Sequence, residues 1–323
     1  MTENLAGPQA VPPRRETAWT FAAAFAVMLA FFAIAPFIVY PVFLMEVLCF
    51  ALFACAINLL IGYVGLVSFG HALYFGWASY FSAYAAKSWG WHPEFAVLLG
   101  TGVAAVLGAI AGSVAIRRQG IYFAMITLAL AQMMYLVALR VKMTGGEDGI
   151  QAVPRGRLFG EFNLADDMTM YVFIVVVVLA AFLLIYRIIN SPFGEVLKAI
   201  RENEQRTISL GYKTERYKLV AFILSAALAG LAGSLKALVF QLASLTDVHW
   251  NMSGEVVLMT LVGGLGTVFG PVTGAFLIVA MENYFSAFGQ WVLVIQGVIF
   301  VACVLLFRRG IVGELAHALR IKL

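Results

Sequence analysis

The sequence predicts an all-α polytopic membrane protein with about eight transmembrane helices and one re-entrant hairpin of two half-helices. Hydrophobic residues make up 63% of the 323 residues and charged residues only 12%, whereas about a quarter of a soluble domain is charged. The apolar residues are gathered in runs of about twenty, which is the length that a helix needs to cross a bilayer. A water-soluble fold could not bury this much apolar surface.

The N-terminal part contains a polar segment and two apolar runs. Residues 1–17 are polar and contain prolines, which predicts a disordered N-terminus. The run 19–40 resembles a signal peptide in its basic flank, but it is long and leads straight into more apolar sequence. We therefore expect an uncleaved first span. Pro36 and Pro41 bracket a turn, and 42–61 is the second predicted span.

The segment 58–87 contains the third predicted span, and it combines apolar residues with glycines and polar side chains. One interpretation is a pair of closely packed helices, because small residues let helix backbones approach each other in lipid. The other is a broken helix whose free backbone groups line a polar cavity. Three polar side chains accompany the glycines, which favours the cavity. They are the first candidates for a translocation path: Asn58, Ser68 and His71.

Two further spans follow, and the second of them carries polar residues at its centre. The span 95–116 ends at a pair of arginines, and 120–139 contains Thr127 and Gln132. A glutamine in a span usually bonds a neighbouring helix, and lining a polar pathway is the alternative. We include Thr127 and Gln132 among the candidate path residues. A loop then runs over 140–169.

After the fifth span come two more spans, then two apolar segments that are too short to cross a bilayer, and then a final span. After the spans 171–187 and 219–240, the short segments 255–262 and 272–285 flank GGLGTVFGP (263–271). We expect the glycines there to form a tight re-entrant turn that β-branched residues could not form without strain. The predicted turn residues are Gly263, Gly264 and Gly266. The final span is 291–307.

The most polar long stretch, 191–218, lies between two of the most apolar runs. Ser191 is a plausible N-cap, Pro192 suits the first helical position, and Gly211 is a natural stop. The stretch therefore predicts a short amphipathic helix, or two with a break near Asn203. It is either a solvated loop that joins two spans or a docking element for a partner.

The distribution of basic residues predicts the orientation. Fifteen of the 21 Lys and Arg residues fall on one side of the alternating spans, together with both termini and 191–218. By the positive-inside rule that side is cytoplasmic, and 140–169 lies outside. We expect a single transmembrane domain over 18–310, with a cytoplasmic N-terminus (1–17) and a cytoplasmic tail (311–323).

Motifs for catalysis, metal binding and nucleotide binding are missing from the sequence. Neither GxSxG, HExxH nor GxxxxGK[ST] occurs, and the three cysteines lie singly in apolar runs. The basic residues flank spans and form no nucleic-acid patch. Four ionisable residues near span ends are explained by snorkelling and form no evident proton relay: Glu46, Lys236, Glu255 and Glu282. We expect no cofactor, and any transport energy must come from a partner.

Five segments together resemble the permease subunits of branched-chain amino-acid ABC importers, of the LivM type in the LivH/LivM family. They follow the family's order through almost the whole chain after the first span. The segments are NLLIGYVGLVSFGHALYFG (58–76), RRQGIYFAMITLALAQ (117–132), TGGEDGI (144–150), SPFGEVLKAIRENEQRTISLGY (191–212) and GEVVLMTLVGGLGTVFGPVTGA (254–275).

The resemblance implies a non-catalytic inner-membrane subunit of an ATP-driven importer. Its expected partners are a second permease of the family, two cytoplasmic ATPase subunits and a periplasmic binding protein, in the lipid bilayer. The solutes implied are leucine, isoleucine and valine, and the same family also handles urea, short amides and other amino acids. A passive channel would share the broken helices but would not need a charged amphipathic helix. A membrane enzyme would need a catalytic cluster.

The resemblance also places the contact with the ATPase in 191–218. The stretch after Glu204, ending in Ile208 and Gly211, is similar to the loop by which ABC permeases grip their ATPase. We expect its apolar residues to pack in a cleft of that subunit and its charges to fix the register. The coupling residues are then Glu204, Arg206, Ile208, Leu210 and Gly211.

The predicted orientation can be tested by cysteine labelling. With the native cysteines replaced, a membrane-impermeant thiol reagent added from outside should modify Glu161→Cys and spare Glu204→Cys. This result is expected because 140–169 is predicted outside and 191–218 inside. The opposite labelling pattern would contradict the orientation.

Overall fold

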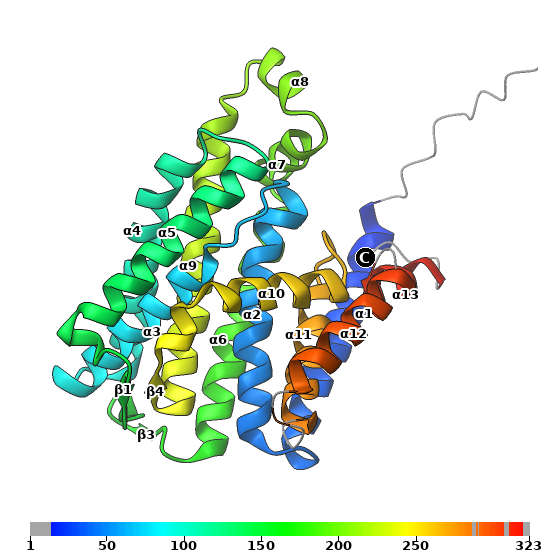
Figure 1. Cartoon of the computed structure of the whole chain (residues 1–323). Coiled ribbons are helices and arrows are strands. Elements are labelled where there is room, and N and C mark those ends of the chain that lie inside the picture. Colours follow the sequence, from blue (N-terminus) through cyan, green and yellow to red (C-terminus); the bar gives the residue numbers. More distant parts are fainter. Residues whose placement is uncertain (1–13, 286–288, 290, 307–309, 319–323) are drawn as a thin grey trace, which may run out of the picture.

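The computed structural model describes residues 14–285, 289, 291–306 and 310–318. In these residues the chain is built almost entirely of α-helices (Figure 1), and each of its strands has only two residues. This confirms the prediction of an all-α polytopic membrane protein. The predicted disordered N-terminus lies outside the described residues up to residue 13, and its remaining residues begin the first helix.

In the described part of the chain, five helices are long and apolar enough to cross a membrane. Each coincides with a predicted span to within a few residues. They are α2 (Pro41–Tyr63), α4 (Pro93–Ala115), α5 (Ile121–Arg140), α6 (Asp167–Ile189) and α9 (Thr214–Phe240). Three further predicted spans are helical but fall short of these criteria, so their crossing stays a prediction. They are α1 (Arg14–Ile34), α3 (His71–Ser88) and α12 (Trp291–Leu306).

Helix α2 is the centre of the bundle. Of its most apolar window, 94% is buried inside the protein, and it contacts α6, α9, α10 (Trp250–Gly263) and α11 (Gly270–Phe285). On one side of it, α3, α4 and α9 pack closely through small residues. Gly230 of α9 faces Ala104 of α4 and Ala78 of α3, with no room for a side chain. Without a hydrophobic drive between helices in lipid, such close backbone packing is what holds them together.

A break separates α2 from α3. Helix α2 ends at Tyr63, Gly65 has a positive φ of 82°, and α3 begins only at His71. The segment 58–87 is therefore a broken helix, and α3 still packs closely against α4 and α9. Before α2, a 3-10 turn (Ala35–Phe37) joins α1 to it, and the Tyr171 hydroxyl of α6 donates to the Phe32 carbonyl of α1 at 2.6 Å.

The strands and their loops lie at one end of the bundle, which we call the strand end (Figure 1). Here β1 (Ile150–Gln151) pairs antiparallel with β4 (Leu242–Ala243), and β2 (Arg157–Leu158) pairs antiparallel with β3 (Phe162–Asn163). The long loop after α5 opens with a 3-10 turn (Lys142–Thr144). A side chain of this loop bonds both α6 and α9.

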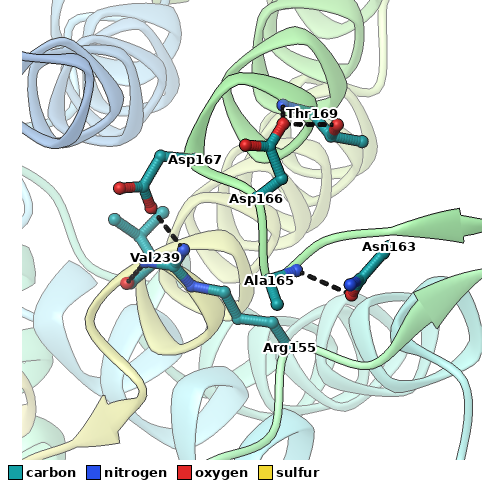
Figure 2. Close-up of polar contacts among 7 residues, drawn as sticks. All are labelled: Arg155, Asn163, Ala165, Asp166, Asp167, Thr169 and Val239. Atoms are coloured by element: carbon teal, nitrogen blue, oxygen red, sulfur yellow. Dashed lines mark hydrogen bonds and ion pairs between the residues drawn. The ribbon is translucent and has the colours of Figure 1, made fainter.

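Arg155 attaches this loop to the ends of two helices (Figure 2). Its guanidinium donates to Asp167 Oδ1 at 2.6 Å and to the Val239 carbonyl at 2.9 Å. Next to it, Asp166 caps α6 by accepting from the N–H and the hydroxyl of Thr169 at 3.0 and 2.8 Å. The hydroxyl and backbone bonds of Thr169 hold the pKa of the Asp166 carboxyl below its ordinary value.

The opposite end of the bundle carries α7 (Pro192–Glu202) and α8 (Glu204–Ser209), shown at the top of Figure 1. The Ser191 side chain caps α7 by accepting from Gly194 N–H, and Asn203 separates the helices and caps α8 by accepting from Arg206 N–H. This agrees with the predicted cap and with the predicted break. We call α7 and α8 together the docking element, after one of the two roles that the sequence predicts for this stretch, and that role stays a prediction.

The last third is a hairpin of short helices. A 3-10 turn (Leu245–Val248) leads into α10, which has 14 residues, and α11 has 16. Helix α10 begins earlier than predicted because the His249 side chain caps it by accepting from Asn251 N–H. After α12, helix α13 (Gly310–Ala318) contacts both α10 and α11, although its residues were predicted to form a tail. That the hairpin enters and leaves the bilayer on one side stays a prediction.

Candidate functional site

The turn between α10 and α11 depends on glycine, as its sequence predicts. Gly264 has φ 125° and Gly266 has φ 75°, conformations that residues with a Cβ rarely adopt. Gly263 has a negative φ but lies directly against the Gly270 carbonyl, where a Cβ would collide with the backbone. The three glycines therefore bring the two helices together over a very short connection.

Asn58 of α2 holds this turn. Its side chain donates to the Thr267 carbonyl at 2.8 Å and accepts from Gly266 N–H at 3.0 Å, and it is itself buried. The backbone groups of this turn have no helical partners, and such groups need partners within the protein wherever water does not reach them. One amide side chain provides both the donor and the acceptor.

A second set of polar side chains, Ser68, His71 and Ser225, connects the break after α2 with α9 and with α2 itself. The two ring nitrogens of buried His71 lie 2.9 Å from Ser68 Oγ and 2.9 Å from Ser225 Oγ, and Ser225 donates to the Ala56 carbonyl at 2.5 Å. Because the Ser225 proton is used on a carbonyl, Ser225 Oγ accepts from His71 Nε2–H. In a neutral imidazole, Nδ1 then accepts from the Ser68 hydroxyl.

The predicted path residues are thus divided by the structure. Ser68 and His71 are in contact, Asn58 lies at the hairpin turn, and Thr127 is buried beside Gly70 and donates to the Ala124 carbonyl of its own helix. Gln132 is on the exposed face of α5. The four buried side chains bond within the chain, and the assignment of these residues to a translocation path stays a prediction.

The structure also gathers ionisable residues that are far apart in the sequence. Lys236 of α9 forms an ion pair with Asp247, with side-chain exposures of 15% and 1%. Its ammonium lies within 5.9 Å of the ring centroids of Phe50 and Phe75. Glu255 interacts electrostatically with Lys236 and with two other carboxyls, Glu46 and Glu282. Explaining Lys236 by snorkelling is therefore wrong, because its ammonium is held inside the protein by Asp247. This partner becomes visible only in the tertiary structure.

Glu204, the first predicted coupling residue, points into the protein. Its carboxylate pairs with Lys218 Nζ at 2.5 Å and accepts from the Thr214 hydroxyl at 3.1 Å and from Gln119 Nε2 at 2.8 Å. The side chains of Lys218 and Glu204 are 4% and 18% exposed. This carboxylate joins α8 to the start of α9 and to the connection between α4 and α5.

The other predicted coupling residues face outward. Ile208 is 47% exposed and Leu210 is 70% exposed, and Arg206 is exposed as well. Gly211 ends the element with φ 92°. Large apolar side chains this exposed, at the end of the bundle where the charged helices lie, are typical of a surface that a partner covers.

A groove runs beside these side chains, between α7 and the start of α9. It has a volume of about 940 Å³. The rings of Phe193 and Tyr217 stack at 5.6 Å between centroids on its wall. Residues lining it come from α7 (Pro192, Phe193, Val196) and from the segment after α8 (Leu210, Tyr212). Of the predicted coupling residues, Leu210 lines this groove.

The glycine turn can be tested with two matched substitutions. Gly264→Ala should lower stability by about 1–3 kcal/mol, because alanine is strained at a positive φ. Gly254→Ala, in the helix just before the turn, should leave stability unchanged or slightly higher, because nothing lies within 4 Å of a Cβ there. Thermal unfolding of the detergent-solubilised protein measures both. Equal melting temperatures for the two variants would show that the turn does not require glycine.

Comparisons with known proteins show which proteins this chain is similar to. It is 27% identical over 290 residues to the high-affinity branched-chain amino acid transport system permease protein LivM of Salmonella typhimurium, covering 82% of this chain and 68% of that protein. The Escherichia coli protein of the same name matches equally, with 27% identity and the same coverage. A probable LivH permease of Methanocaldococcus jannaschii is 30% identical over 170 residues, covering 48% of this chain and 51% of that protein. No solved structure matches.

The family match covers most of the chain. The family described as "Branched-chain amino acid transport system / permease component" matches residues 42–306, from the start of α2 to the end of α12. That range includes the docking element, the hairpin and Asn58. The chain therefore belongs to the family of permease components of branched-chain amino acid transport systems.

Proposed function

We propose that this chain is the membrane-spanning permease subunit of an ABC importer that carries leucine, isoleucine and valine, driven by ATP hydrolysis in a separate subunit. The observation that carries the proposal is the docking element. Its exposed apolar residues are Ile208 on α8 and Leu210 directly after it, and α8 is fixed to the bundle by internal hydrogen bonds and an ion pair. The relatives named above are permeases for branched-chain amino acids, which supports the solute class.

The complex that we propose contains this chain, a second permease of the same family, two ATPase subunits and a periplasmic binding protein. The ATPase covers the outward face of α8 and the adjacent groove. The charge distribution supports an inner-membrane orientation with the docking element and both termini in the cytoplasm, because fifteen of the 21 basic residues lie on that side. The binding protein then docks at the strand end.

Within the docking element the residues divide their roles. Ile208 and Leu210 supply the apolar contact, and Arg206 supplies a charge at its edge. Glu204 is engaged with Lys218 and therefore positions α8, in place of the direct contact with the ATPase that the sequence predicts. Gly211 lets the chain turn back into α9, since its φ of 92° suits glycine.

The proposal predicts that Leu210→Asp uncouples the transporter. Placing a charge in the apolar contact should remove an anchor worth about 2 kcal/mol, which is on the order of thirtyfold in ATPase affinity. ATP-dependent uptake of labelled leucine by proteoliposomes containing the complete complex should fall at least about tenfold. Leu210→Met, which keeps an apolar side chain of similar volume at the same position, serves as the control and should keep uptake.

Two outcomes would contradict the proposal in different ways. Wild-type uptake by Leu210→Asp, with normal retention of the ATPase during purification, would show that α8 is not the docking surface. If the wild-type complex takes up urea or acetamide but not leucine, isoleucine and valine, the proposed importer stands and the proposed solute class is wrong.

A further inference from the structure

We propose that Arg201 is a positioning residue that transmits movement of the docking element to the hairpin turn between α10 and α11. This inference rests on the proposed function of α8 as the ATPase contact. It concerns a side chain on the last turn of α7, two residues before the Asn203 cap that separates α7 from α8.

The Arg201 side chain bridges the docking element and the end of α2. Its Nη1 donates to the Gly62 carbonyl in the last turn of α2. The last carbonyls of a helix have no partner within the helix and carry the negative end of its dipole, so a guanidinium stabilises them well. Arg201 thus completes the C-terminus of the most buried helix in the bundle.

The same side chain also lies against the break after α2 and against the hairpin turn. A Cβ added at Gly65 would lie 3.3 Å from Arg201 Cγ, and a Cβ added at Gly266 would lie 3.2 Å from Arg201 Nη1. Both positions are glycines with positive φ. Arg201 therefore lies close to three glycines: Gly62 at the end of α2, Gly65 in the break after it, and Gly266 in the hairpin turn.

Further contacts lead from the end of α2 to the hairpin turn. Gly62 is one helical turn after Asn58 in α2, and a Cβ at Gly62 would touch the backbone of Gly266. Asn58 in turn bonds Gly266 N–H and the Thr267 carbonyl at 3.0 and 2.8 Å. The docking element and the turn thus contact the same short end of α2, one through Arg201 and the other through Asn58.

Glu204 and Arg201 have different attachments, and this difference suggests how movement passes. Glu204 fixes α8 to α9 through Lys218, in a largely buried ion pair. Arg201 instead bonds a helix end and lies beside a glycine turn, where the backbone can change conformation. When the ATPase shifts the docking element, the part attached through Arg201 is the hairpin turn.

The test uses two fluorescent reporters in the assembled complex, with the native cysteines replaced by alanine. One environment-sensitive dye is attached to Ser209→Cys on α8 and the other, in a separate preparation, to Leu265→Cys in the turn; both positions are exposed. Each is measured without nucleotide and with ATP trapped by vanadate. With Arg201 intact, both dyes should respond to trapping.

In Arg201→Gln the dye at position 209 should respond as before, and the response at position 265 should fall at least about fivefold. Uptake should fall while the ATPase rate is retained, because the partner still docks. The matched control is Lys198→Gln on the same helix, whose ionic partner is Glu195 of that helix at 2.8 Å; both responses should persist. Arg201→Lys keeps the charge without the planar fork and should give an intermediate response at position 265.

The possible failures can be told apart. An unchanged response at position 265 in Arg201→Gln would overturn the inference and leave the proposed function intact. A dye at position 209 that does not respond in the complex with Arg201 intact would overturn the proposed function, and the inference with it. If Arg201→Gln does not assemble, a full response at position 265 in Arg201→Lys alone would overturn the role of the guanidinium fork.

Discussion

The hydrogen bonds from Asn58 to the hairpin turn are the interaction on which the rest of the structure depends. In a bilayer, backbone that leaves the helical conformation needs partners within the protein. The buried second half of α2 supplies them at three places: Asn58 bonds the turn, the Ala56 carbonyl accepts from Ser225 in the His71 group, and the Gly62 carbonyl accepts from Arg201. The hairpin, the break before α3 and the docking element therefore share one support.

This arrangement relates the two ends of the molecule. Helix α9 carries an ion-paired lysine near each end: the buried Lys218 pairs with Glu204 of α8, and the partly buried Lys236 pairs with the buried Asp247 just before α10. Removing one partner of a buried ion pair destabilises the fold by more than the intact pair stabilises it. Both pairs therefore hold their segments on α9. The docking element and the start of the hairpin are thus anchored on a single rigid helix, while the turn itself is reached through α2. We therefore propose that relative movement is directed to the glycines of the turn.

Much of the fold could be predicted from local patterns, and the long-range contacts could not. Hydropathy located α2, α4, α5, α6 and α9, and Ser191, Pro192 and the glycines at 263–266 marked the docking element and the turn. These signals act over a few residues. Asn58 and Gly266 are 208 residues apart, and whether Glu204 faces a partner or Lys218 depends on how α8 lies on α9. An exposed charge and a buried one look the same in the sequence, so the inward direction of Glu204 and the Lys236 pair were missed.

Hydrogen exchange in the turn tests most directly whether α2 supports the hairpin. The amides of residues 264–269 should be protected in the wild-type protein in lipid nanodiscs, because Gly266 N–H is bonded to Asn58. Asn58→Leu removes both bonds at similar volume and should leave a penalty of about 1–3 kcal/mol, so exchange in this segment should accelerate roughly tenfold or more. Exchange within α4 should stay unchanged. Equal exchange of the turn in both proteins would contradict the claim that Asn58 holds it.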